Sequence, residues 1–178
     1  MEYIPGPDFP TGGMILGQQG LKNAYTTGNG SIVIRSKAHI DHFKNGKSEI
    51  VVTEIPYMLN KTRLIERIAE KKKKKIVDGI TDLRDESSMK GIRIVIELRK
   101  DVNPEVMLNN LYKYTQFQTT FSIILLMLDG LTPKTLGLKD IISKYIDHQK
   151  EVIIRRTRFD LEKAEQRVHI LEGYKIAQ

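Results

Sequence analysis

A strand that ends in proline lies at the centre of the predicted fold, in the sequence Glu49-Ile50-Val51-Val52-Thr53-Glu54-Ile55-Pro56. Residues 49–55 have the composition of a strand, and Pro56 ends it because proline lacks the N–H that a strand ladder needs. Upstream, Asn45-Gly46 is a strong hairpin turn signal, and residues 31–37 also have the composition of a strand. The sequence therefore predicts an antiparallel pair, with residues 49–55 as its returning strand.

Further strands are expected on both sides of this pair. Met14-Ile15-Leu16 is long enough for one short strand among the glycine and proline turns of the first thirty residues. Residues 91–98 alternate between apolar and polar side chains, which predicts a half-buried strand. The β-branched and aromatic content of residues 117–128 also favours a strand. Together these segments predict a mixed or antiparallel sheet.

Two helices should flank the sheet. Asn60 is a plausible N-cap for a helix that continues to about Lys75, with apolar residues at helical spacing. Asn103-Pro104-Glu105 opens a second helix, with proline at its first position. The predicted fold class is therefore α+β, a sheet with flanking helices.

The spacing of apolar residues changes after residues 132–134. From Leu138 onward, apolar or large side chains recur in alternating steps of four and three, without a helix breaker before Gly173. This spacing predicts a long helix with an imperfect coiled-coil seam that needs a partner helix. We therefore expect an α+β domain over residues 1–135 and a helical arm over residues 136–178.

Composition limits the function classes. The chain has 178 residues, a formal net charge of +7 and no cysteine, so thiol catalysis, disulfides and thiolate zinc sites are excluded. The positive charge predicts attraction to a polyanion, most commonly nucleic acid. The start of the chain lacks the pattern of a secretion signal, and its longest apolar run, residues 121–128, is too short to span a membrane. These features predict a soluble, cytoplasmic chain.

Several motifs, in their order and spacing, resemble one family over essentially the whole chain. They are Ile4-Pro5-Gly6-Pro7-Asp8-Phe9-Pro10-Thr11, Ala24-Tyr25-Thr26-Thr27-Gly28, Glu54-Ile55-Pro56-Tyr57, Gly79-Ile80-Thr81-Asp82-Leu83-Arg84-Asp85-Glu86-Ser87, Leu108-Asn109-Asn110-Leu111-Tyr112, Asp147-His148-Gln149 and His169-Ile170-Leu171-Glu172-Gly173. The family is that of the DNA-cleaving A subunits of bacterial type IIA topoisomerases. The motifs resemble the gyrase members most, with the topoisomerase IV members second.

The resemblance implies that this chain is an internal piece of such a protein. It would span the tower domain and the start of the coiled-coil arm, and support the cleaved duplex. The implied partners are double-stranded DNA, a second A subunit in an A2B2 enzyme, and the topoisomerase B subunit, with no membrane. The implied cofactors are magnesium and ATP, both used by the B subunit, whereas none is expected to bind this piece.

In the family, a tyrosine hydroxyl attacks a DNA phosphate, and metal ions assist the step. The seven tyrosines of this chain do not stand in the Arg-Tyr context of that nucleophile. We therefore expect no catalytic residue here and no activity from this piece alone. Asp82, Asp85 and Glu86 match no metal-ligand template, and Arg84 stands among them. They are expected to form a structural ion-pair loop, so no metal site is predicted.

Five cations are the candidate DNA-binding residues because they lie on or near the predicted strands and the start of the following helix. They are Lys22, Arg35, Lys37, Lys61 and Arg63. Contact with phosphates needs only cationic donors at matching spacing, although most surface lysines merely keep a protein soluble. The run Lys71–Lys75 is interpreted as a solvated helix end that suits the helix dipole, with DNA contact as the alternative.

Two further hypotheses stay open. The same region of a topoisomerase IV A subunit would share the mechanism but favour decatenation. Alternatively, the piece is purely a structural and oligomerisation module. The basic surface argues against that hypothesis, and the long apolar seam argues for it.

Overall fold

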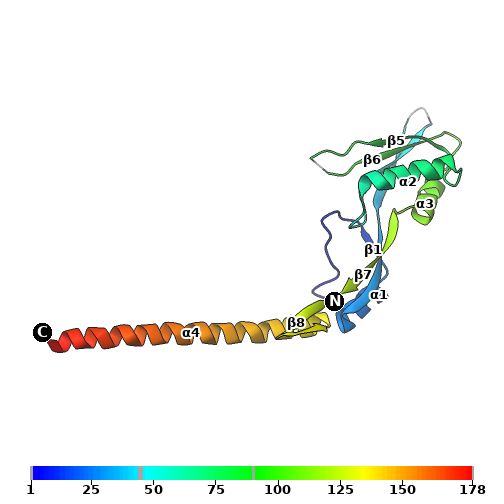
Figure 1. Cartoon of the computed structure of the whole chain (residues 1–178). Helices are drawn as coiled ribbons and strands as arrows, with labels where there is room; N and C mark the ends of the chain where they lie inside the picture. Colours follow the sequence, from blue (N-terminus) through cyan, green and yellow to red (C-terminus); the bar gives the residue numbers. More distant parts are fainter. Residues whose placement is uncertain (1, 44–45, 90, 178) are drawn as a thin grey trace. The chain divides into compact units, whose positions relative to one another are not determined.

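The computed structural model describes residues 2–43, 46–89 and 91–177. The chain divides into two compact units (Figure 1). The α+β unit comprises Met1–Asn23 and Gly30–Ile123, and the helical unit comprises Ala24–Asn29 and Ile124–Gln178. The α+β fold class, with antiparallel sheets followed by a long helix, is confirmed.

The first sheet of the α+β unit has three strands, in the order β1-β2-β7. They are β1 (Met14–Leu16), β2 (Asn29–Arg35) and β7 (Gln118–Ile124). β1 and β2 are antiparallel, with Ile15 opposite Ile34. The predicted strands at residues 14–16 and 31–37 thus exist, the second as β2, and they pair with each other. Residues 117–128, expected to form one strand, are instead divided between β7 and a strand of another sheet at Leu126–Asp129.

The second sheet has four antiparallel strands, in the order β3-β4-β6-β5. They are β3 (Lys37–His42), β4 (Ser48–Glu54), β6 (Ile94–Leu98) and β5 (Ile80–Asp85). The hairpin partner of β4 is therefore β3, and the expectation that residues 31–37 fill this place is wrong. Gly46 N–H donates to the carbonyl of Phe43 at 3.0 Å in the connecting turn, whereas Asn45 lies outside the described residues.

Two helices supply the other half of the core. They are α2 (Lys61–Lys73) and α3 (Pro104–Tyr114), which begin after the N-caps Asn60 and Asn103 as predicted. Each cap side chain accepts backbone N–H groups of the first turn, and this satisfies donors that a helix cannot pair internally. α2 ends at Lys73, two residues before the predicted end.

The core lies between these helices and one face of the four-stranded sheet. Cross-strand pairs of β4 and β6, Ile50 with Ile96 and Val52 with Ile94, face the helices. The helices contribute four fully or nearly fully buried side chains, Leu64, Ile68, Met107 and Leu111. Each such burial stabilises the fold by about 1.5–3 kcal/mol, so the strands and helices fold as one unit.

One helix was not predicted. α1 (Gln19–Thr27) occupies a region where glycines were expected to form turns only. Gly20 lies inside this helix because the backbone of the next strand passes close to it. A Cβ atom at Gly20 would stand 1.7 Å from the carbonyl oxygen of Ser31. The glycine that resembles a turn signal is therefore a packing residue.

The helical unit contains a short hairpin and one long helix. The hairpin pairs β8 (Leu126–Asp129) with β9 (Thr132–Thr135), and the helix is α4 (Leu138–Ala177). The ammonium of Lys144 in α4 lies 2.8 Å from Asp129 and ties the helix to the hairpin, whereas the ammonium of Lys134 lies 2.9 Å from the same carboxylate within the hairpin. α4 has 40 residues and none of them is buried. The predicted long helix is confirmed and continues through Gly173.

Candidate nucleic-acid interface

Arg35 is held inside the α+β unit. Its guanidinium donates through Nε and Nη2 to Gln118 Oε1, at 2.9 and 2.7 Å. The same group lies 4.4 Å from the centre of the Tyr112 ring, a favourable cation–π geometry. Tyr112 in turn donates its hydroxyl to the carbonyl of Ser36. Arg35 therefore joins the end of β2 to β7 and α3, and its guanidinium is already engaged within the protein.

Lys37, the first residue of β3, is paired with Glu54. Lys37 Nζ lies 3.1 Å from Glu54 Oε1, and Glu54 Oε2 accepts the N–H of Gly13 at 2.6 Å. The hydrogen bond from Gly13 and then that from Lys37 hold the pKa of the Glu54 carboxyl below its ordinary value. Lys37 remains largely exposed, but a carboxylate offsets its charge.

Lys61 makes the shortest of these ion pairs. Its Nζ lies 2.7 Å from Asp85 Oδ2, and this contact joins the first turn of α2 to β5. Hydrogen bonds from Lys61 and then from Ser87 lower the pKa of Asp85 to about 2. Lys61 therefore stabilises the unit as well as contributing positive charge.

The two remaining candidates have exposed side chains. Lys22 lies exposed on α1, and Arg63 lies exposed on the first turn of α2. Within the part of the chain that the structure describes, the guanidinium of Arg63 has no ion-pair or hydrogen-bond partner. Among the five candidates, Arg63 is thus the cation most available to an incoming phosphate.

The five candidates come from four elements, and only Lys61 and Arg63 share one. Arg67, Lys71 and Lys74 line one hollow of about 410 Å³ at the far end of α2. Arg67 was not considered from the sequence, and Lys71 and Lys74 were considered only within the run Lys71–Lys75, with DNA contact as the alternative to a solvated helix end. Their spacing of four and three along a predicted helix was the signal that could have identified them.

The acidic residues around Arg84 form ion pairs, as predicted, although residues 80–85 are strand β5 and not a loop. Arg84 contacts Asp82, Glu86 and Glu97, and these hydrogen bonds raise the pKa of the guanidinium. Arg93 continues the network by contacting Glu86 at 3.0 Å. Among residues 2–43, 46–89 and 91–177, no three His, Asp or Glu side chains are grouped to hold a metal ion.

The tyrosine environments favour the neutral phenol where the structure resolves a shift. Burial raises the pKa of Tyr25 and of Tyr112 above the ordinary value. Tyr57 instead packs in an aromatic cluster, with its ring 5.4 Å from that of Phe9 and 6.0 Å from that of Phe121. These three tyrosines serve packing and hydrogen bonding.

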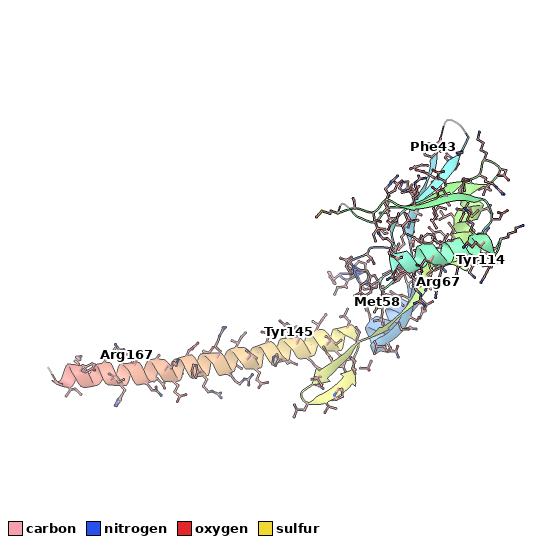
Figure 2. All side chains as sticks on the ribbon, turned by 45° about the horizontal axis from the view of Figure 1, so that its top comes forward. Phe43, Met58, Arg67, Tyr114, Tyr145 and Arg167 are labelled. Atoms are coloured by element: carbon pink, nitrogen blue, oxygen red, sulfur yellow. The ribbon has the colours of Figure 1, made fainter. Side chains whose placement is uncertain are left out.

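α4 exposes many large apolar side chains (Figure 2 labels Tyr145). They are Ile142, Tyr145, Ile146, Ile153, Ile154, Phe159, Leu161, Val168, Ile170, Leu171, Tyr174 and Ile176. A single helix cannot bury such residues against itself, so this surface can accept a packing partner. None of the described helices is both long and apolar enough to cross a membrane.

Comparison with known proteins covers the whole chain. A profile of the family that comprises the A subunits of DNA gyrase and topoisomerase IV matches residues 1–178. The chain is 53% identical over 177 residues to the DNA gyrase A protein of Streptococcus pneumoniae TIGR4, covering 99% of this chain and 22% of that protein. It is 58% identical over 177 residues to the protein of the same name from Halalkalibacterium halodurans, with 99% and 21% covered. The chain thus spans about a fifth of the length of these curated relatives.

Proposed function

Since the chain belongs to the family of DNA gyrase and topoisomerase IV A subunits, we propose that it forms part of the DNA breakage-reunion subunit of a gyrase. In this role the α+β unit supports the duplex that is cut, and α4 links it to the coiled-coil gate. The observation that carries the proposal is the family match over all 178 residues. The enzyme as a whole is an isomerase that introduces negative supercoils in an ATP-dependent reaction.

The proposed contact with DNA is electrostatic. Lysine and arginine side chains bind phosphate oxygens without regard to base sequence, and displace counterions as they do so. Arg63 and Lys22 are exposed on the α+β unit and would make the primary contacts. Lys37 and Lys61 each keep an ammonium with further N–H donors beside their carboxylate partners. Lys37 and Lys61 would make secondary contacts with phosphates. Arg35 would hold the neighbouring strands in place.

The proposal assigns no chemical step to this chain. Tyr25 and Tyr112 have raised pKa values, which disfavours the phenolate that a nucleophile needs. Cleavage would use a tyrosine elsewhere in the whole protein, and magnesium and ATP would bind the B subunit. The proposed partners in a cytoplasmic A2B2 enzyme are therefore double-stranded DNA, a second A subunit, and the B subunit.

Removal of charge from the two exposed candidates tests this proposal. The reconstituted A2B2 enzyme carrying K22Q and R63Q should bind duplex DNA more weakly than the unchanged enzyme. The slope of its log affinity against log salt should be shallower by about 1.8, because each of the two lost phosphate contacts removes roughly 0.9 from the slope. A suitable control is R99Q, since Arg99 is paired with Asp78 and Asp101. An unchanged slope in the double variant would count against DNA contact by these residues.

The names of the relatives favour gyrase over topoisomerase IV, because those from Streptococcus pneumoniae, Halalkalibacterium halodurans and Fibrobacter succinogenes are all DNA gyrase proteins. An assay of the complete enzyme distinguishes the two. Negative supercoiling of relaxed plasmid supports gyrase. Efficient decatenation without supercoiling would support the topoisomerase IV alternative.

A structural and oligomerisation role is a second candidate, favoured by the exposed apolar side chains of α4. An unpaired apolar helix tends to associate. Sedimentation velocity of the isolated chain should then show concentration-dependent dimers, and replacement of Ile153 and Phe159 by glutamate should abolish them. A monomer at all concentrations would contradict this role.

A further inference from the structure

Four cations form a stripe along α2, from Arg63 through Arg67 and Lys71 to the C-cap residue Lys74. Their spacing of four, four and three residues places them on one side of the helix. At 1.5 Å per residue the stripe is about 16 Å long. Along the axis of a duplex, this length corresponds to roughly five phosphates of one strand.

The far end of the stripe lines a hollow. Arg67, Lys71 and Lys74 border this space of about 410 Å³ on the side of α2, together with Glu70. The last residue of α3 and the two that follow it close the other side, namely Tyr114, Thr115 and Gln116. In Figure 2, Arg67 and Tyr114 lie beside each other at this end of α2. Three cations and one carboxylate thus line the same side of this concave surface, and the excess of positive charge there attracts anions.

The cations of the hollow are not engaged by the protein itself. Within the described residues, the side chains of Arg67, Lys71 and Lys74 have no ion-pair or hydrogen-bond partner. This distinguishes them from Lys72 in the same run, whose Nζ donates to the carbonyl of Thr81 at 2.8 Å. It also distinguishes them from Lys37 and Lys61, which have carboxylate partners. The helix dipole favours any cation at this end of α2, but it does not account for the convergence of three of them on one hollow.

Gln116 supplies a second observation at the same place. Its Oε1 is buried and lacks a hydrogen-bond donor within the described residues. A buried acceptor without a donor is destabilising. Protein–DNA interfaces commonly hold water between side chains and phosphates. A water molecule bound between a phosphate and Gln116 would supply the missing donor.

We propose that Arg63, Arg67, Lys71 and Lys74 form a second phosphate-binding surface, which extends the DNA contact along α2 and ends in this hollow. The ligand is the phosphodiester backbone of a duplex, bound without base readout. This inference rests on the proposed function, because it requires that the α+β unit meets DNA. It differs from the interpretation of Lys71–Lys75 as a mere solvated helix end.

The run of lysines offers a matched test. In the reconstituted A2B2 enzyme, K71Q/K74Q removes two cations that line the hollow. The control K73Q/K75Q removes two exposed cations of the same run, which leaves the net charge of both variants equal. Binding of a fluorescent duplex is measured by anisotropy between about 50 and 300 mM salt, where phosphate contacts govern affinity.

The slope of log affinity against log salt should decrease by about 1.8 in K71Q/K74Q, which corresponds to two lost phosphate contacts. It should change little in K73Q/K75Q. Equal changes in both variants would overturn the inference in favour of diffuse electrostatics. An unchanged slope together with weaker binding of the B subunit would overturn it in favour of an acidic protein surface.

The outcomes also separate this inference from the proposed function. If K22Q/R63Q reduces the slope but K71Q/K74Q does not, only the second surface fails. If the unchanged enzyme binds duplex DNA without dependence on salt, both fail.

Discussion

Lys61 and Asp85 tie the first turn of α2 to the edge strand β5, with 2.7 Å between Nζ and Oδ2. The two residues are 24 positions apart in the sequence. Asn60 caps the same helix one residue earlier. The start of α2 is therefore fixed both by its own cap and by a contact with the sheet, and this fixes the position of Arg63 as well.

The pair makes stability depend on pH. The pKa of Asp85 is about 2 in the folded chain against an ordinary 3.8, so folding favours the ionised carboxylate. The stabilisation is present above about pH 4 and is lost as pH falls from 3.8 towards 2. Because both side chains are about a third exposed, its size should be at most about 1 kcal/mol.

Urea unfolding of wild type and D85N at pH 6 and pH 2 measures this contribution. The wild-type chain should be the more stable at the higher pH, and the difference should shrink at the lower pH. D101N is a matched control because Asp101 is well exposed in its pair with Arg99. A difference that is the same at both pH values would show that Asp85 acts other than through its charge.

Ile68 belongs to the hydrophobic core. This side chain is fully buried between α2 and the sheet, so Ile68→Ala should lower the free energy of unfolding by about 2–5 kcal/mol. The control Val106→Ala removes an apolar side chain that is 56% exposed on α3, and should cost under about 0.5 kcal/mol. Chemical denaturation measures both, and similar losses in the two variants would contradict the assigned core.

The cap of α3 can be tested without touching the core. Asn103 Oδ1 accepts the N–H groups of Glu105 and Val106 at 2.9 and 3.3 Å. N103A should cost about 1 kcal/mol, whereas N103D keeps an accepting oxygen and should cost much less. Thermal unfolding of the two variants supplies the comparison. Equal destabilisation of N103A and N103D would mean that Asn103 stabilises the chain other than through these hydrogen bonds.

Arg35 should be mainly a structural residue. R35K keeps the charge but loses the two donors to Gln118 and the planar stack on Tyr112. Its free energy of unfolding should fall by about 1 kcal/mol, while the salt dependence of duplex binding stays unchanged. A reduced slope without loss of stability would instead make Arg35 a direct phosphate contact.

Local signals in the sequence predicted much of the fold. The caps Asn60 and Asn103 correctly predicted where both core helices begin. The end of α2 was predicted to within two residues. The regular apolar spacing after Leu138 identified α4. These elements are set by interactions between neighbours in the chain, which a sequence pattern records directly.

Contacts between distant segments explain what was missed. The chain changes sheets at Ser36, whose N–H donates to Phe117, 81 positions further along by their numbering, so β2 and β3 are separate strands. Half of the residues of β5 are charged, and the strand lies at a sheet edge, where a strand needs few apolar side chains. Long-range contacts also limited the prediction of the candidate site. The sequence identified the cations, but it did not predict that Lys37 pairs with Glu54 or that Lys61 pairs with Asp85.

Binding of duplex DNA by this chain over a salt series, with a parallel cleavage assay in magnesium, tests whether the chain contacts DNA phosphates without cutting the strand. We expect binding that weakens steeply with salt and no covalent product between protein and DNA. Absence of binding at low salt, or a covalent product formed by this chain alone, would contradict it.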